Sequence, residues 1–90
     1  MAKVKLPISL QRFTEGMGEL QIDAATIAEL LKKMIQNYPQ LKGKLVDEKG
    51  NTGEFIRLYV NEEDIELLGG KSTFLGDQDT VSIITPLAGG

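Results

Sequence analysis

The sequence predicts an α+β fold in which one main helix covers one face of a mixed sheet. Two segments with apolar residues at every second position stand near the N-terminus, a segment with helical spacing follows, and further alternating segments come after it. Strands on both sides of a single helix are typical of a sheet that the helix covers on one face only. We expect four to five strands in a single domain over residues 1–90, because a chain of this length can bury one core.

The first two strands are expected to form an antiparallel hairpin. The residues expected on the buried face of the first strand are Val4, Leu6, Ile8 and Leu10. Pro7 has no N–H to donate, so an irregularity is expected there. Gly16 and Gly18 predict a turn, after which Leu20 and Ile22 alternate with polar residues.

The helix is predicted from a capping box and an apolar stripe. Thr26 precedes Glu29 by three residues, a spacing at which each side chain binds a free N–H of the first helical turn. Pro39 ends the helix. The apolar stripe consists of Ile27, Leu30, Leu31, Met34, Ile35 and Tyr38.

The second half of the chain predicts two more strands joined by turns. The stretch 41–54 is rich in glycine and charge, so we expect a short strand or a loop anchored by Leu45 and Val46, then a turn over 49–53. A strand follows with alternate buried residues, namely Ile56, Leu58 and Val60. Turns are expected at 62–64, 69–70 and 76–79, before a last strand with Val81 and Ile83 buried.

Composition excludes several classes of function. The chain has no Cys and no His, so it has no thiolate nucleophile, no Cys-based metal site and no imidazole base. No carboxylate set converges in the sequence, so we predict no catalytic residue and no metal site. No segment reads as a signal peptide or a membrane span, which makes a cytoplasmic location the expectation.

Charge is divided unevenly along the chain. Residues 1–45 hold seven Lys or Arg against four Asp or Glu, and residues 46–90 hold three against nine. A nucleic-acid partner is therefore not expected, because phosphate binding needs clustered basic residues. The acidic half fits a partner with a basic docking surface. Glu62, Glu63 and Asp64 are read either as a solvated turn or as part of such a docking surface.

The last two residues of the sequence, Gly89 and Gly90, bury no side chain and lose much conformational freedom when ordered. Three interpretations are open: a remnant of a linker, a frayed terminus, or a tail kept slim so that it can enter a narrow site in another protein. An apolar strand runs into these glycines without a polar spacer, which favours the third.

These features together carry a family resemblance. The order of hairpin, helix and strands, "YVNEEDI" at 59–65, "GDQDTVSII" at 76–84 and the terminal "AGG" resemble the ubiquitin-like sulfur carriers. That family includes the small subunit of molybdopterin synthase, the thiazole-pathway carrier of thiamin synthesis, and a carrier that serves cysteine synthesis. The resemblance covers nearly the whole chain and implies a β-grasp fold.

The resemblance also implies a function for the tail. In this family an adenylating enzyme, similar to ubiquitin-activating enzymes, uses ATP to activate the C-terminal carboxylate, and a sulfur donor then displaces AMP to leave a thiocarboxylate. By this resemblance Gly90 carries the sulfur, and the carrier itself binds no cofactor and performs no catalysis. Residues 86–90 are expected to be a flexible tail, in which Pro86 stiffens the base, Leu87 and Ala88 grip a groove, and Gly89 threads with Gly90 into the partner.

The strand pattern predicts a docking patch beside this tail. If Leu58 and Val60 face the core, Arg57 and Tyr59 face outward, and Ile84 lies on the opposite face from Ile83. In the β-grasp order the last strand lies beside the 56–61 strand, so Arg57, Tyr59 and Ile84 are expected to form one exposed patch that binds the activating enzyme.

Two further functions remain open at this stage. One alternative to a sulfur carrier is a ubiquitin-like modifier, joined through Gly90 to lysines of target proteins. The other is an interaction domain with an inert terminus. Among carriers, the stretch 42–54 resembles the molybdopterin and cysteine types, and "RFTEG" at 12–16 together with "YVNEEDI" at 59–65 favours a carrier of the cysteine-synthesis or general kind. The molybdopterin type would need a large subunit as its partner; in the other cases a sulfur-accepting synthase is expected.

Overall fold

The computed structural model describes residues 1–52 and 56–85. Its strands are β1 (Ala2–Lys5), β2 (Glu19–Ile22), β3 (Arg57–Val60), β4 (Glu63–Asp64) and β5 (Thr80–Ile84), and its α-helices are α1 (Ile8–Gln11) and α2 (Ile27–Asn37). Short 3-10 helices occupy Pro39–Leu41, Ile65–Leu67 and Gly70–Ser72. The α+β class and the single main helix are confirmed.

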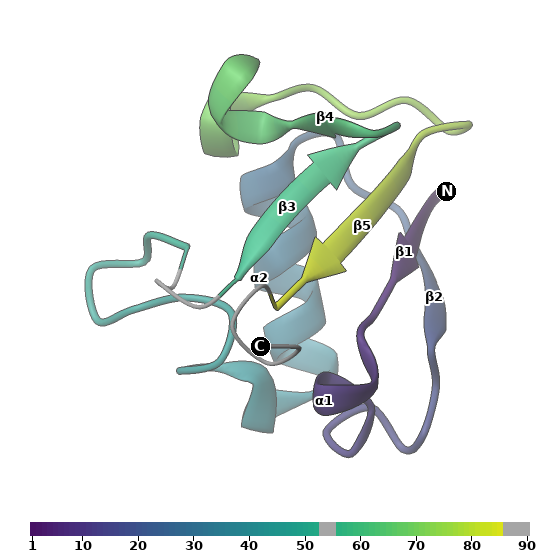
Figure 1. The fold of residues 1–90 in the computed structure, drawn as a ribbon, viewed down its shortest axis with the longest axis vertical. Coiled ribbons are helices and arrows are strands. Elements are labelled where there is room, and N and C mark those ends of the chain that lie inside the picture. Colours follow the sequence, from purple (N-terminus) through teal and green to yellow (C-terminus); the bar gives the residue numbers. More distant parts are fainter. Residues whose placement is uncertain (53–55, 86–90) are drawn as a thin grey trace.

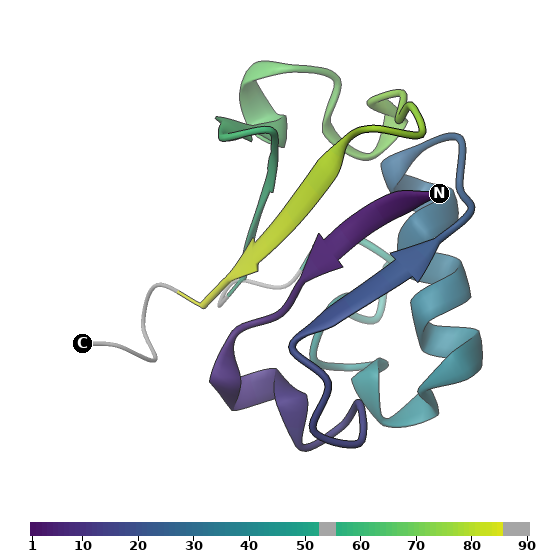
Figure 2. The same ribbon diagram turned by 90° about the vertical axis from the view of Figure 1, so that its right-hand side faces the viewer.

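The sheet is mixed and has the order β2-β1-β5-β3-β4 (Figure 1). The neighbouring strands β1 and β5 run parallel, and every other neighbouring pair is antiparallel. Helix α2 packs across one face of the sheet (Figure 2). Within residues 1–52 and 56–85, no helix of comparable length covers the other face. This is the ubiquitin-like β-grasp arrangement that the resemblance implied.

The predicted capping box sets the start of α2. Thr26 is the N-cap, its hydroxyl oxygen accepts the Glu29 N–H at 3.2 Å, and the Glu29 carboxylate accepts the Ala25 N–H at 3.0 Å. At the other end, Pro39 begins a separate 3-10 turn, because proline supplies no N–H to continue the α-helical ladder.

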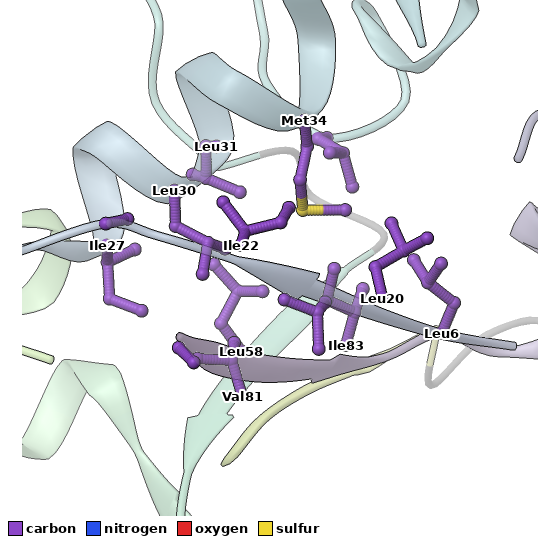
Figure 3. Close-up of a cluster of buried hydrophobic side chains, with 14 of the residues drawn as sticks. Leu6, Leu20, Ile22, Ile27, Leu30, Leu31, Met34, Leu58, Val81 and Ile83 are labelled. Carbon is purple, nitrogen blue, oxygen red and sulfur yellow. The ribbon is translucent and has the colours of Figure 1, made fainter. Parts of the chain in front are cut away.

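The core lies between α2 and the sheet. Figure 3 shows the apolar stripe of α2 facing the inward side chains of the strands. The buried residues of this core include Val4, Leu20, Ile22, Ile27, Leu30, Leu31, Met34, Leu58, Val60, Val81 and Ile83. The expected alternation therefore holds for β2, β3 and β5.

The prediction of one strand through Leu10 is wrong beyond Lys5. Residues 8–11 form α1 instead, and Ile8 is 85% exposed although it was expected in the core. Pro7 stands at the N-cap of this helix, where its missing N–H costs nothing and its carbonyl accepts the Leu10 N–H. The helical turn carries Leu10 into the core and points Ile8 away from it.

The loop after α2 is anchored as expected. Leu41 and Leu45 are completely buried, and Val46 is half-buried. A turn over 47–51 follows, in which the Asp47 carboxylate accepts two backbone N–H groups; Gly53, the expected end of this turn, lies outside the described residues.

The acidic turn differs in detail from its prediction. The reversal is made by Asn61 and Glu62, both at positive φ, and residues 63–64 already pair back with β3 as strand β4.

Among the described residues, no helix is both long enough and apolar enough to cross a membrane.

Candidate functional site

The end of β5 is where the predicted tail begins. β5 is a central strand, it ends at Ile84, and Thr85 is the last residue that the structure describes before residues 86–90. The predicted tail residues Pro86, Leu87, Ala88, Gly89 and Gly90 lie outside the described residues. The candidate site is therefore the surface around Ile84 and Thr85.

The structure brings the three predicted patch residues together. Arg57 and Ile84 are directly opposite each other in the β3–β5 pair, and Tyr59 is opposite Ser82 two residues along. Residues opposite each other in an antiparallel pair share a face of the sheet. Ile84 is 43% exposed, Arg57 is exposed and Tyr59 is half-buried, whereas Leu58 points into the core. We call Arg57, Tyr59 and Ile84 the exit patch.

Arg57 is held in place from the neighbouring strand. Its Nη1 donates to Asp64 Oδ2 at 3.3 Å, and Asp64 Oδ1 also accepts the Glu66 N–H at 2.9 Å. Asp64 is the better shielded partner, with its side chain 18% exposed against 57% for Arg57. This contact orients the guanidinium on the sheet face rather than adding much stability, since exposed ion pairs contribute at most about 1 kcal/mol.

An apolar groove beside the exit patch was missed by the sequence analysis. It measures about 620 Å³ and lies between the segment 5–9 and the end of β5 at 82–85. Leu6, Pro7 and Ile8 line one side, and Ile83 and Ile84 line the other. The signal that could have found it is Pro7, because a helical turn after proline exposes Ile8 at the rim.

The α1 side of the groove is tied to the end of β5. The hydroxyl groups of Ser9 and Thr85 are 3.2 Å apart, within hydrogen-bond distance. Residues 76 positions apart in sequence are thereby joined at the point where the chain continues toward Pro86. We call the apolar groove between residues 5–9 and residues 82–85 the exit groove.

Two cations stand at this end of the sheet, each with an acidic neighbour: Lys5 is opposite Glu19 in the β1–β2 pair, and Arg57 donates to Asp64. Lys5 lies opposite Ser82 in the β1–β5 pair, and Arg57 lies opposite Ile84, so two cations flank the exit groove. Glu62 and Glu63 stand at the other end of β3, next to the start of β5, whereas the Asp64 carboxylate reaches Arg57 of the exit patch. The acidic turn therefore contributes Asp64 to this surface.

The described residues contain no group of three acidic side chains placed to hold a metal ion. Within the part of the chain that the structure describes, the pKa of Asp79 is displaced from its ordinary value. Asp79 directly precedes β5, whereas Ile84 is at the other end of that strand. The Asp79 pKa is lowered mainly by the Gly76 N–H and further by the Asn61 side-chain amide.

Comparison with known proteins places the chain in a family. The model of the ThiS family matches residues 4–90. The sulfur carrier protein CysO of Mycobacterium tuberculosis is 30% identical over 89 residues, which cover 97% of this chain and 96% of that protein. Small archaeal modifier protein 3 of Haloferax volcanii is 31% identical over 83 residues, covering 87% and 89% of the two chains.

A solved structure shares the fold closely. A chain in the crystal structure of the Amycolatopsis orientalis BexX/CysO complex superposes with a TM-score of 0.88 at 29% identity, and the match covers 94% of each chain.

Proposed function

Because the chain belongs to the ThiS family and is a sulfur carrier protein of the CysO, ThiS or archaeal modifier type, we propose that Gly90 is the residue that carries the sulfur. The observation that supports this assignment is the extent of the family match, which runs through the core and on to Gly90. The proposed carrier binds no cofactor of its own and takes its chemistry from partner enzymes.

The proposed chemistry has two steps. In the first, the Gly90 carboxylate attacks the α-phosphorus of ATP in an adenylating enzyme, which forms an acyl adenylate and releases pyrophosphate. In the second, hydrosulfide supplied by a sulfur donor attacks the acyl carbon, AMP leaves with the electron pair of the broken bond, and a thiocarboxylate remains on Gly90 once the sulfur has lost its proton. A receiving synthase or large subunit then accepts the sulfur. AMP is a far better leaving group than oxide, which is why the carboxylate needs activation.

The composition of residues 86–90 suits this chemistry. An active site that surrounds an acyl group and a nucleotide leaves little room beside the backbone, and Gly89 and Gly90 have no Cβ to fill it. Leu87 and Ala88 supply apolar contacts to the walls of such a channel, and Pro86 restricts the backbone just after Thr85.

We further propose that the exit patch and the exit groove dock the adenylating enzyme. Ile84 and Ile8 offer exposed apolar surface in the groove that Thr85 also lines, and Lys5 and Arg57 add a cation on either side. The matching partner surface is apolar with acidic residues at its rim. This replaces the basic partner surface expected from the charge of the second half.

The test is the intact mass of the protein purified from its native host without reducing or alkylating agents. A species heavier by about 16 Da, the difference of sulfur for oxygen, is expected, with the added mass on Gly90 in the C-terminal peptide. The same species should form in vitro with ATP, the candidate adenylating enzyme and a sulfide source.

The matched control is a chain that lacks Gly90. It keeps residues 1–89, so its fold should be unchanged, and it should show neither the adenylate nor the heavier species. Failure of the full chain to form an adenylate with every candidate enzyme of its host would overturn the proposal.

The Haloferax relative favours a second candidate function, because it is named a modifier protein. As a modifier, the chain would join the Gly90 carbonyl to the amino group of a target lysine and lose AMP in the same step. Tryptic peptides with a C-terminal remnant of this chain on lysine would identify this outcome. A pool that contains only free and thiocarboxylated carrier would exclude it.

Two observations bear on the receiving enzyme. The resemblance to the cysteine-type carriers agrees with the similarity to CysO proteins, so we propose cysteine synthesis as the receiving route. The Amycolatopsis structure holds CysO in a complex with a second protein, BexX, which supports a carrier that works by docking.

A further inference from the structure

Thr85 lies just beyond the hydrogen-bonded pairing of the sheet. β5 pairs with β1 as far as Ser82 and with β3 as far as Ile84. On the β1 side, the segment after Lys5 contains Pro7, which has no N–H to donate to a continued ladder. Within residues 1–52 and 56–85, no strand pairing therefore reaches Thr85, and a different contact must hold it.

A side-chain contact reaches Thr85 instead. The hydroxyl oxygens of Ser9 and Thr85 are 3.2 Å apart, and either group can donate the hydrogen bond. Thr85 is half-buried, Ser9 is exposed, and both residues line the exit groove. Figure 1 and Figure 2 both show α1, which carries Ser9, next to the point where β5 ends. We call this contact between the two hydroxyl groups the hydroxyl latch.

The helix that carries Ser9 is firmly mounted. Leu10 is 5% exposed and fixes one side of α1 in the core. The side-chain amide of Gln11 donates to the Leu6 carbonyl at 3.2 Å, which ties α1 to the segment before it. The same amide lies against Gly18, where a Cβ would come within 2.9 Å of Gln11 Nε2. Ser9 therefore has a fixed position from which it can hold another residue.

Holding the Thr85 hydroxyl also restricts the Thr85 backbone. Threonine is branched at Cβ, so it has few χ1 rotamers, and φ and ψ decide which of them is allowed. The next residue is Pro86, and a residue before proline is driven out of the α region. A fixed hydroxyl position therefore selects few backbone conformations at Thr85, and so few directions in which the chain continues.

We propose that Ser9 is a positioning residue for the sulfur-transfer chemistry and that it acts through Thr85. The proposal rests on the function proposed above, in which Gly90 must reach an adenylating site while the exit patch is docked. Five residues follow Thr85, and five extended residues span about 17 Å, so a change of direction at Thr85 displaces Gly90 over a wide arc. The hydroxyl latch narrows these directions before docking, which reduces the conformational entropy lost when the tail enters the site.

The alternative role for Ser9 is a direct contact with the adenylating enzyme, and the two roles differ in kinetics. A residue that positions the reacting end lowers kcat, whereas a residue that only contributes to docking raises KM. In the positioning role the two hydroxyl groups act as one unit, so losing both costs no more than losing one. Two independent contacts with the enzyme would instead give effects that multiply.

The first test needs no enzyme. The three-bond coupling between Hα and Hβ of Thr85, measured by NMR on the intact carrier, reports its χ1 rotamer. The coupling should show one rotamer in wild type and a mixture of rotamers in Ser9→Ala. Ser72→Ala, which removes an exposed serine hydroxyl in the 3-10 helix Gly70–Ser72, should leave the coupling unchanged. A mixture of Thr85 rotamers in wild type would overturn the proposal.

The second test is the kinetics of Gly90 adenylation, followed by pyrophosphate release. Ser9→Ala and Thr85→Val should each lower kcat by about threefold with KM nearly unchanged, and the double variant should be no slower than either single variant. Thr85→Val keeps the branched shape and removes the hydroxyl. Thr85→Ser, which keeps the hydroxyl, should retain most of the wild-type kcat, and Ser72→Ala should match wild type. Urea denaturation should give the same midpoint for all these variants.

The outcomes separate this proposal from the function on which it rests. Effects that multiply in the double variant, or that appear in KM alone, would overturn the positioning role and identify docking contacts. Equal kcat for Ser9→Ala and wild type would also overturn it, while adenylation of Gly90 would stand. A wild type that forms no adenylate with any candidate enzyme would overturn the proposed function and the positioning role together, even with a single Thr85 rotamer in the free carrier.

Discussion

Arg57 and Ile84 lie directly opposite each other on β3 and β5, at the end of the sheet where the chain continues into residues 86–90. The pair sets an exposed apolar side chain beside a cation that Asp64 holds in place. Neither residue lies in the core, so each can be changed with little effect on folding. The pair is therefore a suitable place to test docking apart from stability.

We expect Ile84→Asp combined with Tyr59→Ser to lower the rate of Gly90 adenylation by about tenfold or more, because a central apolar contact at an interface contributes more than about 1 kcal/mol. The measurement is pyrophosphate release with the adenylating enzyme at subsaturating carrier. The reduction should appear in kcat/KM, since the variant changes docking and leaves Gly90 intact.

Leu67→Asp is the matched control for this variant. Leu67 is 82% exposed and lies in the 3-10 helix after β4, away from the exit patch. The Leu67→Asp variant should leave the rate of Gly90 adenylation unchanged. Equal rates for wild type and a folded Ile84→Asp, Tyr59→Ser variant would rule out the exit patch as a docking site.

Ile8 and Leu10 should respond oppositely to truncation. Leu10→Ala removes a side chain that is 5% exposed and should lower the free energy of unfolding by roughly 2–5 kcal/mol. Ile8→Ala changes a side chain that is 85% exposed and should alter it by no more than about 0.5 kcal/mol. Urea denaturation measures both.

A single strand through this segment would bury both residues on one face and make the two losses similar. Similar losses would therefore contradict α1. If Ile8→Ala is neutral in stability and also slows adenylation, the exit groove takes part in docking.

The error at Ile8 shows where the sequence pattern stops being informative. Alternation over residues 3–10 fits a strand and also fits a strand followed by one helical turn, since the apolar positions 6 and 10 are one turn apart. Pro7 decides between them, because it caps a helix readily and cannot donate in the ladder. That preference depends on the free space beside the end of β5, which only the tertiary structure provides.

The arrangement of the exit patch was predictable and the exit groove was not. Alternate burial in β3 and β5 places Arg57, Tyr59 and Ile84 on one face once the strand order is known. The exit groove depends on the helical turn after Pro7, which the alternation of apolar residues does not reveal. The roles of residues 86–90 stay predictions, because the resemblance alone carries them.

The capping box of α2 should make a measurable contribution to stability. Thr26→Ala removes the acceptor of the Glu29 N–H and should cost about 1 kcal/mol in the free energy of unfolding. Thr26→Ser keeps the hydroxyl and should cost much less. Chemical denaturation of the three proteins checks this, and a loss as large for serine as for alanine would show that the methyl group, not the cap, stabilises the helix.

Asp79 should make stability depend on pH in the acid range. Its carboxylate accepts the Gly76 N–H and the Asn61 amide, each at 2.8 Å, and these donors lower its pKa from the ordinary 3.8. The unfolded chain therefore takes up this proton at a higher pH than the folded chain. The stabilisation is fully present above the unfolded pKa and is lost as the pH falls through the folded pKa.

Asn61→Gly tests the cause of this shift. Asn61 has a φ of 48°, a conformation that glycine adopts without strain, so the variant removes the side-chain donor and keeps the turn. The Asp79 pKa, measured by NMR titration of its carboxyl carbon, should rise toward its ordinary value and remain below it, because the Gly76 N–H still donates. Asp77→Asn, at a side chain that is 84% exposed, should leave the Asp79 pKa nearly unchanged. An Asp79 pKa that does not move in Asn61→Gly would mean that the Gly76 N–H alone sets it, and the link between the β3–β4 turn and the start of β5 would then carry no charge stabilisation.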